Sequence, residues 1–413
     1  MTRAAGWVIV VTTTIALWLA PLAQAQDWPQ WRGPNRDAKV TGFQAPATWP
    51  KELTQKWKLT VGDGVATPAL VGDKLYVFAR QNGNEIIRCL NAATGEVLWH
   101  DENPAEAPTG NSAPFPGPRS SPTVGEGKLI TLGVRGELIC YEAASGKKLW
   151  AKNDFAGNVP RFFTSASPII ADGQCLAQLG GAMKGAIVSY DLNSGDEKWR
   201  WTGDGTAYAS PMMLTVEGQP FVVTLTEKSV VAISPVDQKV VWSVPYSAQR
   251  GGYNAATPII DSNIVIFSGS GRGTKAVKFE KKDGQLAPTE LWSNSEISVQ
   301  FDTPVLKDGL LYGFTATENL FCLSATDGKT MWTTPRMEGG GGRSGYGSIV
   351  DCGPVLMALT PAANLMVFEP SDKELKPLAN YKVADSETHA YPVVSRNRIF
   401  IKDKNDVILW TIE

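Results

Sequence analysis

Side chains able to hold an anion or a planar ring recur in this chain shortly before a small residue followed by proline or isoleucine. Guanidinium groups bind carboxylates through charge-assisted hydrogen bonds and aromatic rings stack on planar groups, so such a set could form a ligand site. Asp302 is the one carboxylate in it and the candidate base if the chain is an enzyme; otherwise we expect no catalytic residue. The candidate ligand-binding residues are Arg119, Arg161, Tyr208, Arg250, Tyr253, Asn254, Gln300, Asp302, Arg343, Tyr346 and His389.

The composition narrows the chemistry that these residues can perform. The chain has 413 residues, with 39 Lys and Arg against 41 Asp and Glu, and this near-neutral balance argues against nucleic-acid binding. Only two histidines are present and the five cysteines form no CxxC motif, so we expect no metal centre and no covalently attached haem. We interpret the cysteines as small core residues.

A repeat of about 46 residues organises the chain. A degenerate copy at Ser348-Ile349 fills the one double-length gap and gives eight repeats. Each repeat holds four short runs rich in β-branched residues between Gly, Asp or Asn turns, without a helical period. We predict an all-β, eight-bladed β-propeller of four-stranded antiparallel blades, or seven blades if the Ser348 repeat is an insertion. The other repeats are marked by Thr67, Ser121, Ser167, Ser210, Thr257, Thr303 and Tyr391.

Tryptophan closes the fourth run of most repeats. The last repeat stops after about three runs, whereas the run from Leu53 to Leu59, with Trp57, precedes the first repeat. We therefore predict that the N- and C-terminal segments share one blade, which removes exposed sheet edges. An indole at one position per blade can pack between neighbouring sheets, so we assign these residues to structure rather than to a cofactor. They are Trp57, Trp99, Trp150, Trp199, Trp242, Trp292 and Trp332.

The predicted ring brings the candidate ligand residues to one place. In a propeller the connections into the first strand of each blade gather near the axis at one face, so we expect these residues to meet at an axial mouth. Two interpretations remain open for that mouth. It could be a polar, aromatic-walled pocket for a small anionic or planar ligand or a peptide, or its polar side chains could solvate and plug the channel.

The segments from Ala143 to Trp150 and from Ala325 to Trp332 share a spaced Ala-Gly-Trp motif. This motif resembles the tryptophan-docking repeat of the PQQ-like β-propellers, a superfamily that includes quinoprotein alcohol dehydrogenases and the outer-membrane assembly lipoprotein BamB. The resemblance covers residues 50–413 and implies the propeller fold. The opening from Asp27 to Arg36 resembles the N-terminal signature of exported bacterial proteins of this group.

The resemblance implies two different activities. The enzymatic branch holds pyrroloquinoline quinone (PQQ), usually with Ca²⁺, on the axis, and many members clamp the quinone with a vicinal Cys-Cys disulfide that this chain lacks. We therefore expect no cofactor and favour a binding or assembly scaffold similar to BamB over an enzyme, and the question of enzymatic activity stays open. The alternatives are a PQQ-dependent alcohol or sugar oxidoreductase, which would need PQQ and Ca²⁺, and a carbohydrate- or peptide-binding propeller.

The N-terminus predicts export. Residues 1–25 combine Arg3, an apolar run and a small-residue site at Ala23 to Ala25, as in a cleavable signal peptide; the alternative, a membrane anchor, would require a longer apolar run. Residues 26–49 form a leader and residues 50–413 the propeller. No lipid-anchoring cysteine precedes Cys89, so we expect a periplasmic or secreted protein with no transmembrane segment after cleavage. Envelope proteins or a small ligand are the expected partners.

Overall fold

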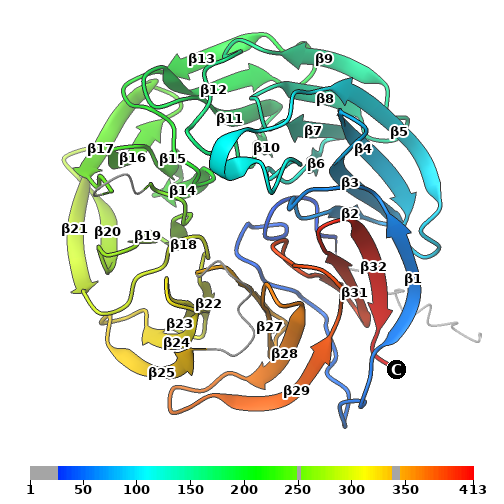
Figure 1. Ribbon diagram of the computed structural model, residues 1–413. Helices are drawn as coiled ribbons and strands as arrows, with labels where there is room; N and C mark the ends of the chain where they lie inside the picture. Colours follow the sequence, from blue (N-terminus) through cyan, green and yellow to red (C-terminus); the bar gives the residue numbers. More distant parts are fainter. Residues whose placement is uncertain (1–26, 249–252, 337–344) are drawn as a thin grey trace, which may run out of the picture.

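The computed structural model describes residues 27–248, 253–336 and 345–413 as a ring of eight four-stranded sheets. Every pair of neighbouring strands within a sheet is antiparallel, and the sheets stand around a central axis like blades (Figure 1). The eight-bladed propeller is thus confirmed, and the seven-bladed alternative is wrong, because the Ser348 repeat forms a complete blade. The predicted signal peptide lies outside the described residues.

Four blades form the first half of the ring, numbered here in chain order. Blade 1 contains β2 (Ala69–Val71), β3 (Lys74–Gln81), β4 (Asn84–Asn91) and β5 (Val97–Pro104). Blade 2 contains β6 (Thr123–Gly125), β7 (Lys128–Leu132), β8 (Leu138–Glu142) and β9 (Lys148–Lys152). Blade 3 contains β10 (Ile169–Ala171), β11 (Gln174–Gly180), β12 (Gly185–Asp191) and β13 (Glu197–Trp201). Blade 4 contains β14 (Met212–Val216), β15 (Gln219–Leu225), β16 (Ser229–Ser234) and β17 (Lys239–Pro245).

Four more blades complete the ring. Blade 5 contains β18 (Ile259–Asp261), β19 (Ile264–Ser268), β20 (Thr274–Lys282) and β21 (Gln285–Asn294). Blade 6 contains β22 (Val305–Lys307), β23 (Leu310–Phe314), β24 (Asn319–Ser324) and β25 (Thr330–Arg336). Blade 7 contains β26 (Ser348–Asp351), β27 (Leu356–Leu359), β28 (Asn364–Glu369) and β29 (Lys376–Lys382). Blade 8 contains β30 (Val393–Ser395), β31 (Arg398–Lys402), β32 (Asp406–Thr411) and β1 (Thr54–Thr60).

The two ends of the chain close the ring in blade 8. Strand β1 pairs antiparallel with β32, with Thr54 opposite Thr411 and Thr60 opposite Asp406. The N-terminal strand therefore supplies the outermost strand of a blade whose other three strands come from the C-terminus. This confirms the predicted shared blade, and it leaves no blade incomplete at the point where the ring closes.

Burial follows position within a blade. The middle strands β7 and β11 are buried at nearly every residue, because both faces of each sheet pack against neighbouring blades. Outer strands such as β1 alternate between exposed and half-buried residues, since one side faces solvent. The five cysteines are buried and none is disulfide-bonded, in agreement with their interpretation as core residues.

Tryptophan side chains on the outer strands pack against the next blade. Trp99 of blade 1 lies against Gly146 of blade 2, where an added Cβ would come within 2.5 Å of the indole. Gly146 also has φ +75°, so glycine is required there for both space and conformation. Trp150 donates from Nε1 to the Leu192 carbonyl of blade 3 (3.0 Å). The same contact with the following blade is made by Trp57 to Ala92, Trp292 to Ala325 and Trp332 to Ser371.

The leader, residues 27–49, enters the ring instead of lying only on its surface. Trp28 is fully buried and exchanges two backbone hydrogen bonds with Leu70 of blade 1 (2.7 and 2.8 Å). The Val40 amide donates to the Asp351 carbonyl of blade 7 (2.7 Å). Arg36 of the same leader reaches blade 3, which faces blade 7 across the ring, so the leader crosses the axis, as the blue segment inside the ring shows (Figure 1).

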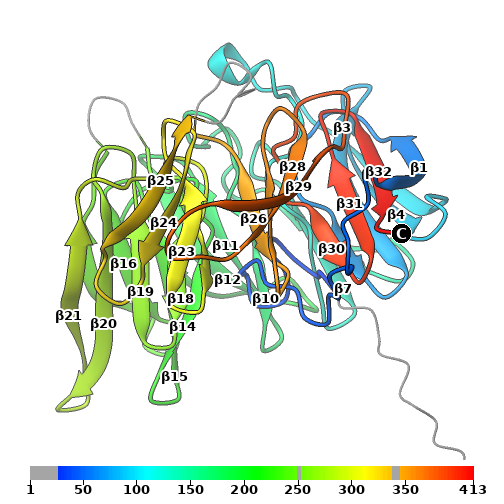
Figure 2. The same cartoon turned by 90° about the horizontal axis from the view of Figure 1, so that it is seen from below.

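Two arginines fix the middle of the leader. Arg32 Nη2 donates to the Pro304 carbonyl of blade 6 (2.8 Å). Arg36 donates to the carbonyls of Ser167 and Pro168 in blade 3, each at 2.9 Å. Burial lowers the pKa of Arg36 to about 9, and the nearby positive charge of Arg32 acts in the same direction. Seen from the side, the leader lies in the lower part of the ring, whereas the short helix η1 (Gly110–Ser112) rises above the upper face (Figure 2).

Among the described residues, no helix is long and apolar enough to cross a membrane.

Candidate ligand pocket at the axial mouth

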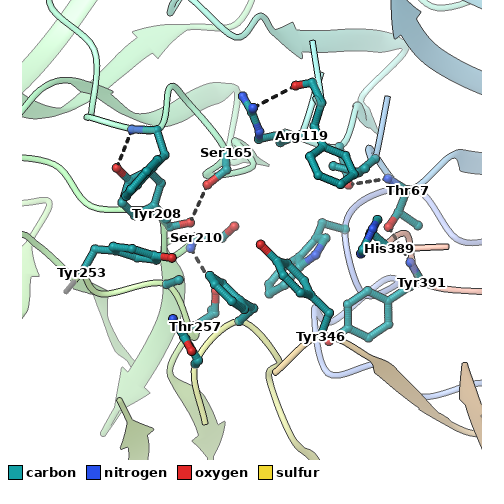
Figure 3. A pocket seen from close by; sticks show the side chains of 18 of the residues that line it. Thr67, Arg119, Ser165, Tyr208, Ser210, Tyr253, Thr257, Tyr346, His389 and Tyr391 are labelled. Atoms are coloured by element: carbon teal, nitrogen blue, oxygen red, sulfur yellow. Dashed lines mark hydrogen bonds between the residues drawn. The ribbon is translucent and has the colours of Figure 1, made fainter. Parts of the chain in front are cut away.

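A pocket of about 590 Å³ occupies the upper part of the axial channel. Its lining comes from connections into the inner strands of the blades, from the η1 segment and from Trp31 of the leader. Figure 3 shows Arg119, Tyr208, Tyr253 and Tyr346 around it. The lining residues are Trp31, Val65, Thr67, Asn111, Ser112, Phe115, Arg119, Ser121, Phe162, Ser165, Tyr208, Ser210, Tyr253, Ala255, Thr257, Gln300, Phe301, Tyr346, Gly347, His389 and Tyr391.

Aromatic rings from successive connections touch one another around the mouth. Phe301 and Tyr346 stack with centroids 4.0 Å apart and planes 8° from parallel. The other ring contacts are tilted or edge-on, with centroids 5.0 to 6.2 Å apart. Each repeat places its aromatic residue near the same point, so the arc is a consequence of the repeat. The rings of this aromatic arc belong to Phe115, Phe162, Tyr208, Tyr253, Phe301, Tyr346 and His389.

A belt of hydroxyl groups links the blades below the aromatic arc. The Thr67 amide donates to Ser121 Oγ (3.0 Å), and the Ser121 amide donates to Ser167 Oγ (3.0 Å). The residue before proline repeats this bond from blade to blade, which explains why a hydroxyl recurs at that position. We call this set the hydroxyl belt; its further links run from Ser167 to Ser210, Ser210 to Thr257, Thr257 to Thr303 and Tyr391 to Thr67, at 2.9 to 3.1 Å.

The hydroxyl belt leaves donor groups facing the pocket. Each of its hydroxyl oxygens accepts an amide hydrogen, and the hydroxyl hydrogen remains to be donated. Four belt residues also line the pocket, and none of their hydroxyls donates to a protein acceptor among the described residues. These four are Thr67, Ser121, Ser210 and Thr257.

Arg119 provides positive charge at the pocket wall. Its Nη2 donates to the Phe115 carbonyl (2.9 Å), while its Nη1 is buried and has no hydrogen-bond partner among the described residues. Burial lowers the pKa of Arg119, and the hydroxyl groups of Tyr346 and Tyr208 act in the opposite direction. Burial raises the pKa of Tyr208 to about 12, so this residue stays neutral at physiological pH.

The structure brings six of the predicted ligand residues together and places three elsewhere. The six that line the pocket are Arg119, Tyr208, Tyr253, Gln300, Tyr346 and His389. Arg161 is exposed and lies outside this lining. Asn254 is buried and donates to the carbonyls of Thr226 (2.8 Å) and Tyr246 (3.0 Å), so it holds backbone instead of facing a ligand. Arg250 and Arg343 lie outside the described residues.

Asp302 does not line the pocket. It is only 2% exposed, and its Oδ2 accepts the Phe314 amide at 2.7 Å. Burial raises its pKa to about 7, with hydrogen bonds and the charge of Arg32 acting in the opposite direction. Asp302 lies in the connection before β22, and its side chain fixes the backbone at the end of β23. The expectation that it meets the other candidates at the mouth is therefore wrong.

Two parts of the pocket were not among the candidates chosen from the sequence. Trp31 comes from the leader, and its ring contacts Tyr391 edge-on at 6.0 Å. Phe115 comes from the connection that carries η1, and it contacts His389 at 5.3 Å. For Phe115, the one signal in the sequence was the length of its connection. The interval between the repeat markers Thr67 and Ser121 is the longest, apart from the double-length gap that the Ser348 copy fills.

Comparison with known proteins identifies the family. A family model described as outer membrane protein assembly factor BamB matches residues 83–334, which is more than half of the chain. The chain belongs to this BamB family. The crystal structure of BamB from Moraxella catarrhalis has the same fold, with a TM-score of 0.63 and 14% identity, covering 87% of this chain and 98% of that one.

The chain is also similar in sequence to quinoproteins. Quinohemoprotein alcohol dehydrogenase from Comamonas testosteroni is 26% identical over 189 residues, and 1-butanol dehydrogenase (cytochrome c) from Thauera butanivorans is 27% identical over 147 residues. These alignments cover 44% and 34% of this chain but only 26% and 21% of the relatives. The structure of the Comamonas testosteroni enzyme superposes with a TM-score of 0.67 at 13% identity, covering 95% of this chain and 81% of that one.

The residues of the pocket do not fit a PQQ–Ca²⁺ centre. Ca²⁺ takes oxygen ligands and usually several carboxylates, but no Asp or Glu is among the described residues that line the pocket. Across the described residues, no group of three or more His, Cys, Asp or Glu could hold a metal ion. The nearest predicted carboxylate, Asp302, is buried away from the pocket and already accepts a backbone amide.

Proposed function

We propose that this chain is an exported binding propeller, which acts in the cell envelope as a scaffold similar to BamB and takes its ligand or partner at the axial mouth. One observation carries the proposal: the leader crosses the channel, so the mouth opens into a blind pocket walled by aromatic rings and hydrogen-bond donors. Pockets of this size and lining are typical of ligand sites. The signal-like residues 1–25 and the membership of the BamB family support an envelope location.

Site-specific photo-crosslinking in native cells tests this proposal. A photoreactive residue at Phe162, in the aromatic arc, is expected to give specific adducts. The same group at Val236, which is 78% exposed on the blade surface, serves as the control and is expected to give none. Equal adduct patterns from both positions, or none from Phe162, would contradict binding at the mouth.

A reconstitution assay tests the competing oxidoreductase function. The purified protein is incubated with PQQ and Ca²⁺ and assayed for dye-linked oxidation of primary alcohols and aldoses. Because the described pocket offers no carboxylate ligand or base, we expect no turnover above the protein-free control. Turnover that requires both PQQ and Ca²⁺ would refute the proposal that the chain acts by binding alone.

A further inference from the structure

The pocket lining offers a set of hydrogen-bond donors. Four hydroxyls of the belt each accept one backbone amide hydrogen and still have their own hydrogen to donate to a ligand. No carboxylate from the described residues lines the pocket to accept these hydrogens. A ligand that satisfies these hydroxyls must therefore carry several acceptor oxygens.

The positive charge of Arg119 at the pocket wall also favours a ligand rich in acceptor oxygens. Arg119 makes no ion pair with any described carboxylate, and one of its guanidinium nitrogens lacks a partner among the described residues. The charges of Asp63 and Glu85 favour the charged form of Arg119, but neither forms an ion pair with it. An anionic group on the ligand would supply the direct partner that this buried cation lacks. The wall therefore favours an anion over a neutral molecule.

The aromatic arc adds a requirement for a ring. Aromatic faces are electron-rich and attract the weakly positive C–H groups on the face of a pyranose as well as other aromatic edges. Tyr253 and Tyr346 extend into the cavity (Figure 3), and the Phe301 ring contacts both of them, stacking on Tyr346. A ring-shaped ligand between these side chains would lie above the belt hydroxyls.

The distribution of donors selects between two kinds of ring-shaped acid. A simple aromatic acid carries its acceptor oxygens on one edge of the ring, whereas the belt hydroxyls belong to four different blades. A sugar acid carries acceptor oxygens around the whole ring in addition to its charged group. The sugar acid therefore matches the belt and Arg119 together.

We propose that the axial pocket binds an acidic saccharide, with its carboxylate or sulfate near Arg119, a ring against the aromatic arc and ring oxygens over the hydroxyl belt. This rests on the proposed function, because it names the ligand class of the same mouth. A pocket of about 590 Å³ has room for a short oligosaccharide end.

Calorimetric titration with matched oligosaccharides tests the ligand class. The probes are trigalacturonate, the neutral galactose trimer, a sulfated disaccharide, and phthalate as an aromatic acid. We expect trigalacturonate to bind about 10- to 100-fold more tightly than the neutral trimer, as for one charge-assisted contact. If the sulfated disaccharide binds and trigalacturonate does not, the acidic group of the ligand is a sulfate rather than a carboxylate. Equal binding of the neutral trimer, or tighter binding of phthalate, would overturn the proposal.

Variants at Arg119 locate the acidic group. Arg119→Met should remove the preference for the acidic trimer, and Arg119→Lys should restore part of it. Arg396→Met is the matched control, since Arg396 is exposed on the turn between β30 and β31, lies outside the pocket lining and should leave affinity unchanged. Unfolding midpoints of all three variants confirm that they remain folded. An equal loss in both methionine variants would refute a specific contact with Arg119.

The results separate the two proposals. If no saccharide binds but Phe162 still gives specific adducts in cells, the ligand class is wrong and binding at the mouth stands. If neither is observed, both proposals fail.

Discussion

The contact between Trp99 and Gly146 should be measurable as a stability difference between two alanine variants of blade 2. Gly146 and Gly127 both have φ +75°, so Gly→Ala imposes the same left-handed backbone cost at each, about 1–2 kcal/mol. An added Cβ meets nothing within 4 Å at Gly127, whereas at Gly146 it would lie 2.5 Å from the Trp99 ring. Displacing that ring adds an overpacking cost of about 1–3 kcal/mol. Gly146→Ala should therefore lose about 2–5 kcal/mol, and Gly127→Ala about 1–2 kcal/mol.

The assay is equilibrium unfolding in guanidinium, with the free energies of unfolding compared at one pH. Trp99→Leu provides the second half of a double-mutant cycle, because it removes the indole that the new Cβ would meet. In the Trp99→Leu background, Gly146→Ala should cost no more than Gly127→Ala. Equal costs of the two glycine variants in the wild-type background would refute the reasoning that docking of Trp99 requires glycine in the next blade.

Three further predictions concern buried groups. Asp302→Asn should remove a pH dependence of stability. Because burial raises the pKa of Asp302 to about 7, the wild type should lose up to about 4 kcal/mol of unfolding free energy relative to the variant as pH rises from about 4 to about 7. Parallel curves of unfolding free energy against pH for the two proteins would contradict this. Trp28→Ala should cost about 3–5 kcal/mol and increase hydrogen exchange in the leader; unchanged exchange there would show that Trp28 does not anchor it. Because burial raises the pKa of the Cys89 thiol to about 11 and that of Cys140 to about 12, neither should react with a disulfide reagent at pH 8 until the protein is unfolded; rapid reaction in the folded state would contradict their burial.

The architecture of the ring could be predicted from the sequence because it depends on local, repeated signals. The marker before proline, the short runs and the turn residues recur in most copies, and even the degenerate copy at Ser348 keeps the strand pattern. The pairing of β1 with β32 followed from counting strands, since only one blade lacked a fourth strand. Such inferences need no knowledge of how distant side chains pack.

The pocket could be predicted only in part because its floor and rim depend on long-range packing. Convergence at the axis correctly placed Tyr253 and Tyr346, because the repeat itself sets their position. Nothing in the repeat predicted that the leader would cross the channel and bring Trp31 under the mouth, since its anchors lie in distant blades. The burial of Asp302 was also missed, because Asp302 lies in the irregular connection before β22, where strand alternation does not set the direction of a side chain.

The central claim is that the axial mouth is the binding site, and blocking the mouth tests it most directly. Ala255 lines the pocket, so Ala255→Trp would place an indole in it, whereas Ala93 is exposed on a turn of blade 1 and Ala93→Trp is the matched control. Both substitutions are combined with the photoreactive group at Phe162, and the yield of adducts in native cells is measured. We predict that Ala255→Trp abolishes the adducts and that Ala93→Trp leaves them unchanged. Undiminished adducts from the folded Ala255→Trp variant would contradict the assignment of the mouth as the binding site.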